Sequence, residues 1–69
     1  MISPRSQEAI TRVAELQAAL AAHGIILPSL GVDLPSVVQT YRAPLVELGN
    51  CSLDTARALT AALRKAADR

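Results

Sequence analysis

The side chains of this chain that could do chemistry include one cysteine and one histidine, and they lie far apart in the sequence. Cys51 comes just before a predicted helix, where exposed backbone N–H groups stabilise a thiolate. The one histidine, His23, belongs to another predicted helix and is too remote in sequence to suggest a base for it. We therefore interpret Cys51 as a half-buried apolar residue that packs onto Ala56. A cysteine-dependent redox or transfer enzyme is the least favoured function.

His23 could combine with a serine and Asp33 into a hydrolytic arrangement. The chain has no glycine-rich nucleophile turn, and its 3 glycines are scattered, so no loop is predicted to cradle a phosphate. Because His23 falls in the last turn of a predicted helix, we assign it to the stabilisation of that helix end. One cysteine and one histidine also exclude a structural zinc site. The prediction is a protein with no catalytic residue, no cofactor and no metal.

Three cations on the last predicted helix, Arg57, Arg64 and Lys65, could face the phosphates of a nucleic acid, as in a helix-turn-helix regulator. Asp54 and Asp68 share that face and would repel a phosphate backbone. The segment before this helix also lacks the pattern of a second, scanning helix. A DNA-binding transcriptional regulator is therefore the alternative function, and nucleic acid is not the expected partner.

Length and composition describe one small domain over residues 1–69. With 51% apolar and 19% charged residues the chain is too hydrophobic to be disordered, and its net charge of +1 excludes a strongly charged tail. Alanine supplies 13 of the apolar residues and Tyr41 is the one aromatic, so the core has no large anchor. No apolar run could span a membrane and no signal core is visible, so we expect a cytoplasmic protein with a reduced thiol.

Two amphipathic helices are predicted, over residues 4–23 and 53–67. Ser3 and Ser52 are good N-cap residues at their starts. Gly24 directly follows the first helix, where glycine commonly ends a helix in the left-handed conformation. In both segments apolar residues recur at helical spacing along one side, so each helix should bury one stripe.

The residues between these helices carry little charge and are interrupted by glycine, proline and serine. Two apolar runs predict short antiparallel strands at about residues 25–32 and 44–48. A competing interpretation places a short helix at 34–41 with Asp33 as its cap, although Val37 and its neighbours have strand propensity. We predict an α+β fold in the order helix, strand, strand, helix, with both helices packed on one face of a short hairpin. The alternative is a three-helix all-α domain.

A two-stranded ribbon and an alanine-rich core are marginal for a lone chain, so self-association is predicted. A twofold axis could join two ribbons into a four-stranded sheet, or bury two apolar faces against each other. The contact should be centred on the strands and supported by the last helix, through Ile25, Ile26, Leu27, Leu45, Val46, Leu48, Leu59 and Leu63. The predicted function is a non-enzymatic protein-interaction module that acts as a homodimer, as a regulator or accessory factor, and binds another protein.

Residues 27–33 (LPSLGVD) and 44–57 (PLVELGNCSLDTAR) resemble short uncharacterised proteins of high-GC actinobacteria, of the kind that accompany phage or plasmid genes. The resemblance covers about the last two-thirds of the chain. It implies a bacterial, cytoplasmic origin, and it implies no activity and no site residues.

Overall fold

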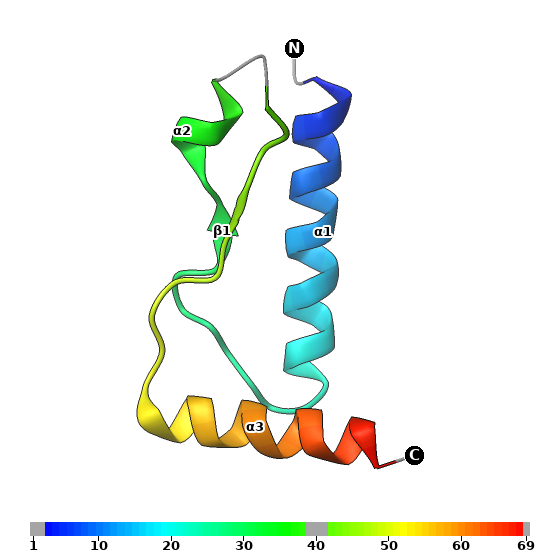
Figure 1. The fold of residues 1–69 in the computed structure, drawn as a ribbon, viewed down its shortest axis with the longest axis vertical. Helices are drawn as coiled ribbons and strands as arrows, with labels where there is room; N and C mark the ends of the chain where they lie inside the picture. The colour runs from blue at the N-terminus through cyan, green and yellow to red at the C-terminus, as the bar shows by residue number, and fades with distance from the viewer. Residues whose placement is uncertain (1–2, 39–41, 69) are drawn as a thin grey trace.

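The computed structural model describes residues 3–38 and 42–68. Its elements follow in the order α1 (Pro4–Ala21), β1 (Gly31–Val32), α2 (Leu34–Val37), β2 (Val46–Glu47) and α3 (Leu53–Ala67). Helix α1 stands beside the antiparallel pair of strands, and α3 crosses the lower end of the molecule (Figure 1). The predicted α+β order of helix, strand, strand and helix in one small domain is confirmed, with the short α2 added between the strands.

Helix α1 ends in a Schellman motif. Gly24, at φ 70°, donates its N–H to the carbonyl oxygen of Ala21, and Ile25 donates to that of Leu20, both at 2.9 Å. The glycine stop is therefore confirmed. The regular helix ends at Ala21, before the predicted residue 23, because the following residues form the turn that this motif closes.

The predicted strand at 25–32 is wrong over its first part. The N–H of Ile25 bonds to the end of α1 and its side chain is buried, so this residue cannot join a ladder. Pro28 then lies in a turn that is closed by the N–H of Leu30 donating to the carbonyl oxygen of Leu27 at 3.2 Å. Regular pairing starts only after this turn.

The hairpin is short but its register continues beyond the regular strands. Gly31 lies opposite Glu47, which confirms a strand within the predicted range 44–48. Two residues further along the same register, Ser29 and Gly49 approach so closely that a Cβ added to Gly49 would collide with the Ser29 side chain. Gly49 also has a φ of 77°, so only glycine satisfies both demands.

Helix α2 begins directly where β1 ends. Asp33 is its N-cap, and a carboxylate oxygen of Asp33 accepts the N–H of Ser36 at 3.2 Å. The competing interpretation of a short helix capped by Asp33 is thus confirmed for residues 34–37, against the strand propensity of that segment. The helix ends earlier than residue 41, with Val38 as its C-cap, and residues 39–41 of that prediction lie outside the described part of the chain.

The core lies between α1 and the segment that returns along it. Four apolar side chains form its centre: Val13, Leu20, Ile25 and Leu30. Helix α3 reaches this cluster with Leu59 and Ala62, both partly buried. The two long helices therefore meet the rest of the chain differently, α1 along the hairpin and α3 across its end (Figure 1).

Candidate interaction surface

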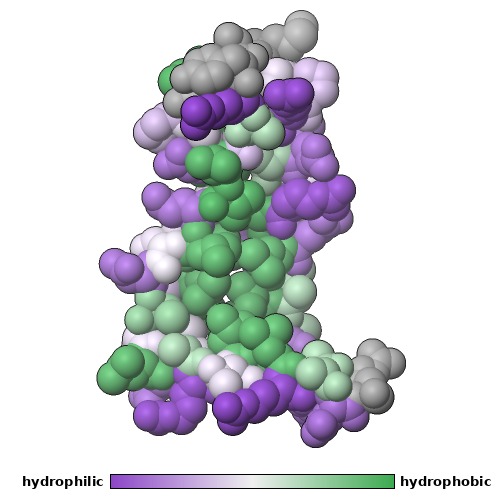
Figure 2. Space-filling model, viewed as in Figure 1, coloured by the Kyte–Doolittle hydropathy of each residue, from purple (hydrophilic) through white to green (hydrophobic). Residues whose placement is uncertain are grey.

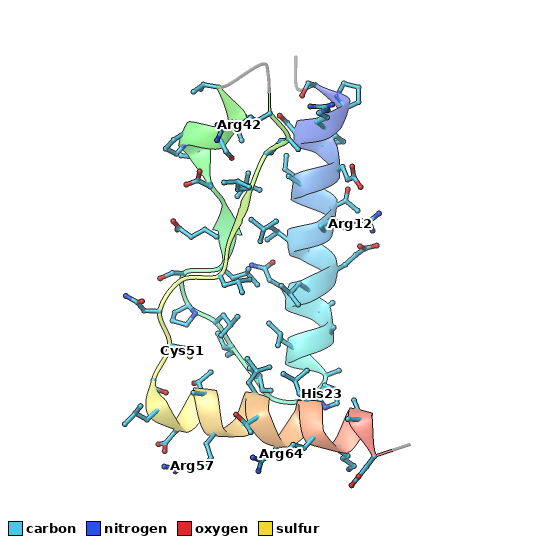
Figure 3. All side chains as sticks on the ribbon, in the orientation of Figure 1. Arg12, His23, Arg42, Cys51, Arg57 and Arg64 are labelled. Carbon is cyan, nitrogen blue, oxygen red and sulfur yellow. The ribbon has the colours of Figure 1, made fainter. Side chains whose placement is uncertain are left out.

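The residues considered for chemistry lie in separate parts of the structure. Cys51 is exposed in the segment between β2 and α3, whereas His23 lies in the turn after α1 (Figure 3). Asp33 is engaged in the cap of α2. The prediction of a half-buried Cys51 on Ala56 is wrong, because both residues are exposed. Among the residues that the structure describes, no group of three or more His, Cys, Asp or Glu could hold a metal ion.

Two of the three cations considered for a nucleic-acid surface lie on the outer side of α3. Arg57 and Arg64 extend away from the rest of the molecule (Figure 3), and Lys65 follows in the last turn. Arg57 donates to a carboxylate oxygen of Asp54 at 3.2 Å, so part of this charge is compensated within the helix. In the described chain β2 separates α2 from α3, so no helix directly precedes α3 as a helix-turn-helix arrangement requires.

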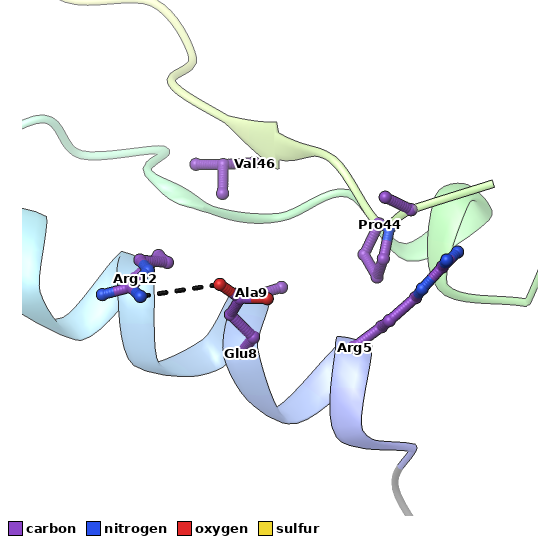
Figure 4. Close-up of a pocket in the computed structure, with 7 residues that line it drawn as sticks. Arg5, Glu8, Ala9, Arg12, Pro44 and Val46 are labelled. Atoms are coloured by element: carbon purple, nitrogen blue, oxygen red, sulfur yellow. Dashed lines mark ion pairs between the residues drawn. The ribbon is translucent and has the colours of Figure 1, made fainter.

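A hollow of about 250 Å³ lies between the first half of α1 and the segment that leads into β2 (Figure 4). It is lined by Arg5, Glu8, Ala9, Arg12, Ala43, Pro44 and Val46. Arg12 pairs with Glu15 at 2.6 Å and with Glu8 at 3.5 Å, as their helical spacing predicts. The hydrogen bond to Glu15, with the charges of both acids, raises the pKa of Arg12. The charged groups of this hollow therefore belong largely to exposed ion pairs along α1, and Val46 forms its apolar border.

An apolar strip runs over the seam between α1 and the hairpin and continues to α3 (Figure 2). In the described residues no large side chain is completely buried, although each side chain of the central cluster is less than a tenth exposed. The apolar residues packed around this cluster, such as Leu27 and Leu59, are only partly buried. One chain alone therefore leaves apolar surface around its core in contact with water.

The residues predicted for the interface differ in how far they are buried. The prediction is wrong for Ile25, which is 3% exposed and lies in the core. Its N–H bonds to the end of α1. Leu27 and Leu59 are partly buried against the same cluster. The remaining members keep exposed apolar surface: Ile26, Leu45, Val46, Leu48 and Leu63.

The hairpin turns these residues in two directions, because alternate side chains of a strand face opposite sides. Val32 packs against the core, and Val46, directly opposite it, lines the hollow beside α1. Leu45 and Glu47 consequently face away from α1, and Asp33, opposite Leu45 in the same register, shares that side. The hairpin has an apolar face toward α1 and an outer face that carries two acids.

Four exposed apolar residues are additional to the predicted set: Ile10, Leu34, Val38 and Leu53. Leu34 and Leu53 each occupy the first position of a helix, where no preceding turn covers the side chain. Their place at the start of a predicted helix could have indicated from the sequence that these two side chains are exposed. Ile10 lies next to the buried Ala9 on α1, at the edge of the buried residues of that helix.

The chain matches no known protein family, no curated protein and no solved structure. None of the described helices combines the length and the apolar character needed to cross a membrane. The surface itself is therefore the basis on which a function is proposed.

Proposed function

We propose that this chain is a non-enzymatic protein-interaction module that acts as a homodimer and binds another protein. The observation that carries the proposal is the amount of surface that one chain leaves uncovered. The chain exposes 5579 Å², whereas a folded monomer of 7.3 kDa exposes about 4,200 Å². Its radius of gyration is 14.0 Å, against about 11 Å for a compact domain of this length.

The surplus area is large enough for a stable contact. It amounts to about 1,400 Å² per chain, compared with about 800 Å² that each partner buries in a standard interface. Exposed apolar residues on the hairpin and on α3, among them Val46, Leu48 and Leu63, contribute to it. Removal of such apolar surface from water is worth roughly 25 cal/mol per Å², so a second copy over the strip would complete the core.

The same proposal places the homodimer in the cytoplasm of a bacterium, as a regulator or accessory factor. A lone exposed thiol such as Cys51 stays reduced in that compartment. The resemblance to short phage- or plasmid-associated proteins supports this setting. No cofactor is part of the proposal.

The test is the mass of the particle in solution, measured by light scattering or sedimentation at micromolar concentration. We expect twice the chain mass of 7.3 kDa. Val46→Lys should give monomers, because it places an unpaired charge in a desolvated apolar contact. The matched control is Glu47→Lys, which adds the same side chain one residue away on the outer face and should leave the dimer intact. A particle of 7.3 kDa at every concentration would overturn the proposal.

A further inference from the structure

The hairpin presents an exposed edge at β2. The N–H of Asp33 donates to the carbonyl oxygen of Leu45 at 2.9 Å, and Gly31 pairs with Glu47, so these residues of β2 direct their main-chain groups toward β1. The groups of Val46 therefore point away from β1. Both residues of β2 are exposed, whereas both residues of β1 are partly buried.

The outward groups of this edge are free within the described chain. Neither the N–H of Val46 nor that of Leu48, the next residue in the same phase, has a hydrogen-bond partner there. Pro44, two residues before Val46, is in phase with them and has no N–H to leave unsatisfied, which is the position in which an edge strand accommodates proline. The edge thus offers the N–H groups of Val46 and Leu48 as donors and the carbonyl oxygen of Pro44 as an acceptor.

We infer that a second copy of this chain adds its own β2 to this edge, antiparallel, about a twofold axis at Val46; this inference rests on the proposed homodimer. The two Val46 residues exchange their N–H and carbonyl groups, and each Leu48 N–H donates to the carbonyl oxygen of Pro44 in the other copy. The product is one four-stranded sheet in the order β1, β2, β2, β1, with both α1 helices on the same side.

The side chains agree with this arrangement. It places the two Val46 side chains next to each other and Leu48 beside Pro44, all on the apolar face of the hairpin. Packing the outer faces of two hairpins would instead bring Asp33 and Glu47 of both copies into a desolvated contact, where like charges are destabilising. The edge contact leaves these carboxylates in water.

Amide hydrogen exchange on the full chain, below and above the concentration at which the dimer forms, tests the pairing directly. The N–H groups of Val46 and Leu48 should exchange at least roughly tenfold more slowly in the dimer than in the monomer. The N–H of Glu47, bonded to β1 within the chain, should respond far less. A dimer in which Val46 and Leu48 exchange as in the monomer would overturn the edge pairing and leave the proposed homodimer standing.

Val46→Pro provides the second arm, because it removes the outward N–H and no hydrogen bond within the chain. We expect a folded monomer by circular dichroism and sedimentation, whereas Val46→Thr, which keeps the N–H and the branched side chain, should remain a dimer. A folded Val46→Pro variant that dimerises as tightly as the parent contradicts the pairing. If this variant fails to fold, the exchange result decides, and a parent chain that is monomeric at every concentration refutes both the pairing and the homodimer.

Discussion

The Ser36 side chain links the two sides of the hairpin just beyond β1. In a regular ladder Asp33 and Leu45 would exchange two backbone hydrogen bonds. One is present, but the N–H of Leu45 donates instead to Ser36 Oγ at 2.8 Å, and this hydroxyl donates to the carbonyl oxygen of Asp33 at 2.6 Å. Because Ser36 is only 4% exposed, water cannot easily take its place as the acceptor of the Leu45 N–H.

Ser36→Ala should lower the free energy of unfolding by about 1–3 kcal/mol, because the Leu45 N–H loses its partner in a partly buried site. Urea denaturation monitored by circular dichroism measures this as a lower midpoint with an unchanged slope. Thr60→Ala is the control: the exposed Thr60 hydroxyl bonds only within its own helix, so its loss should change stability by less than about 0.5 kcal/mol. Equal effects of the two substitutions would contradict the role of Ser36.

Two glycines of the hairpin make a matched pair. Gly49→Ala should destabilise the fold by more than about 1 kcal/mol, since the new Cβ collides with Ser29 and φ is positive. Gly31→Ala meets no atom within 4 Å and requires no unusual φ, so it should stabilise by about 0.4–1 kcal/mol through the unfolded state. Thermal unfolding of both variants gives the sign of each effect. A tolerated alanine at residue 49 would refute the close approach.

At the scale of elements, all three helices of the described chain begin with a cap residue whose side-chain oxygen accepts an N–H of the first turn. In α1 and α3 a serine cap accepts the N–H of the third residue after it at 3.1 Å, as Ser52 does for Thr55. The side-chain hydroxyls of Ser52 and Thr55 also bond each other at 3.0 Å. The hydroxyl pair thus occupies the place that a capping box gives to a serine and a glutamate.

The cap of α3 can be tested in isolation. Ser52→Ala should cost about 1 kcal/mol of stability, because one N–H of the first turn loses its acceptor. Ser52→Asp keeps an acceptor at the same site, and should restore most of that loss. The measurement is the unfolding midpoint together with helical signal in circular dichroism. Equal losses of stability in the two variants would mean that the Ser52 cap does not stabilise the start of α3.

The helices could be predicted from the sequence because their signals are local. Ser3, Gly24 and Ser52 act on backbone groups only a few residues away, and each was placed correctly. The start of β1 could not be predicted in this way, because it depends on Ile25 being drawn into the core and into the end of α1. Strand propensity at 34–37 likewise yielded to the Asp33 cap.

At the scale of the whole molecule, the exposed apolar surface around the core predicts that stability depends on protein concentration. If two copies complete one core, a tenfold rise in concentration should raise the melting temperature by about a few degrees. Differential scanning calorimetry over a concentration series measures this shift. Val46→Lys should melt lower and at a temperature independent of concentration, and the same constancy in the parent chain would contradict association.

The candidate surface was predictable only in part, because it too depends on contacts between segments far apart in the chain. Its apolar composition is visible in the sequence, whereas the assignment of Ile25 to the core and of Leu45 to the outer face depends on turns and register. The position of α3 across the end of the hairpin follows from Leu59 and Ala62 meeting the core, a contact between segments far apart in the chain.

The charge on α3 leads to a prediction about nucleic acid. Because Arg57 is paired with Asp54 and no helix directly precedes α3 in the described chain, we expect no duplex binding tighter than about 10⁻⁵ M at physiological salt. Fluorescence anisotropy with a labelled duplex at several salt concentrations measures it. Tight, salt-sensitive binding that disappears on joint substitution of Arg57→Ala and Arg64→Ala would favour the DNA-binding alternative.

The contact between Ser29 and Gly49 has a consequence for changes in chain length. It brings together the two ends of residues 30–48, so this segment forms a closed loop. The separation of the chain before Ser29 from the chain after Gly49 therefore does not depend on the number of residues in that loop. Since doubling the length of a loop adds only about 0.6 kcal/mol of closure entropy, a change in its length should cost little as long as the Ser29–Gly49 contact and the β1–β2 register are kept.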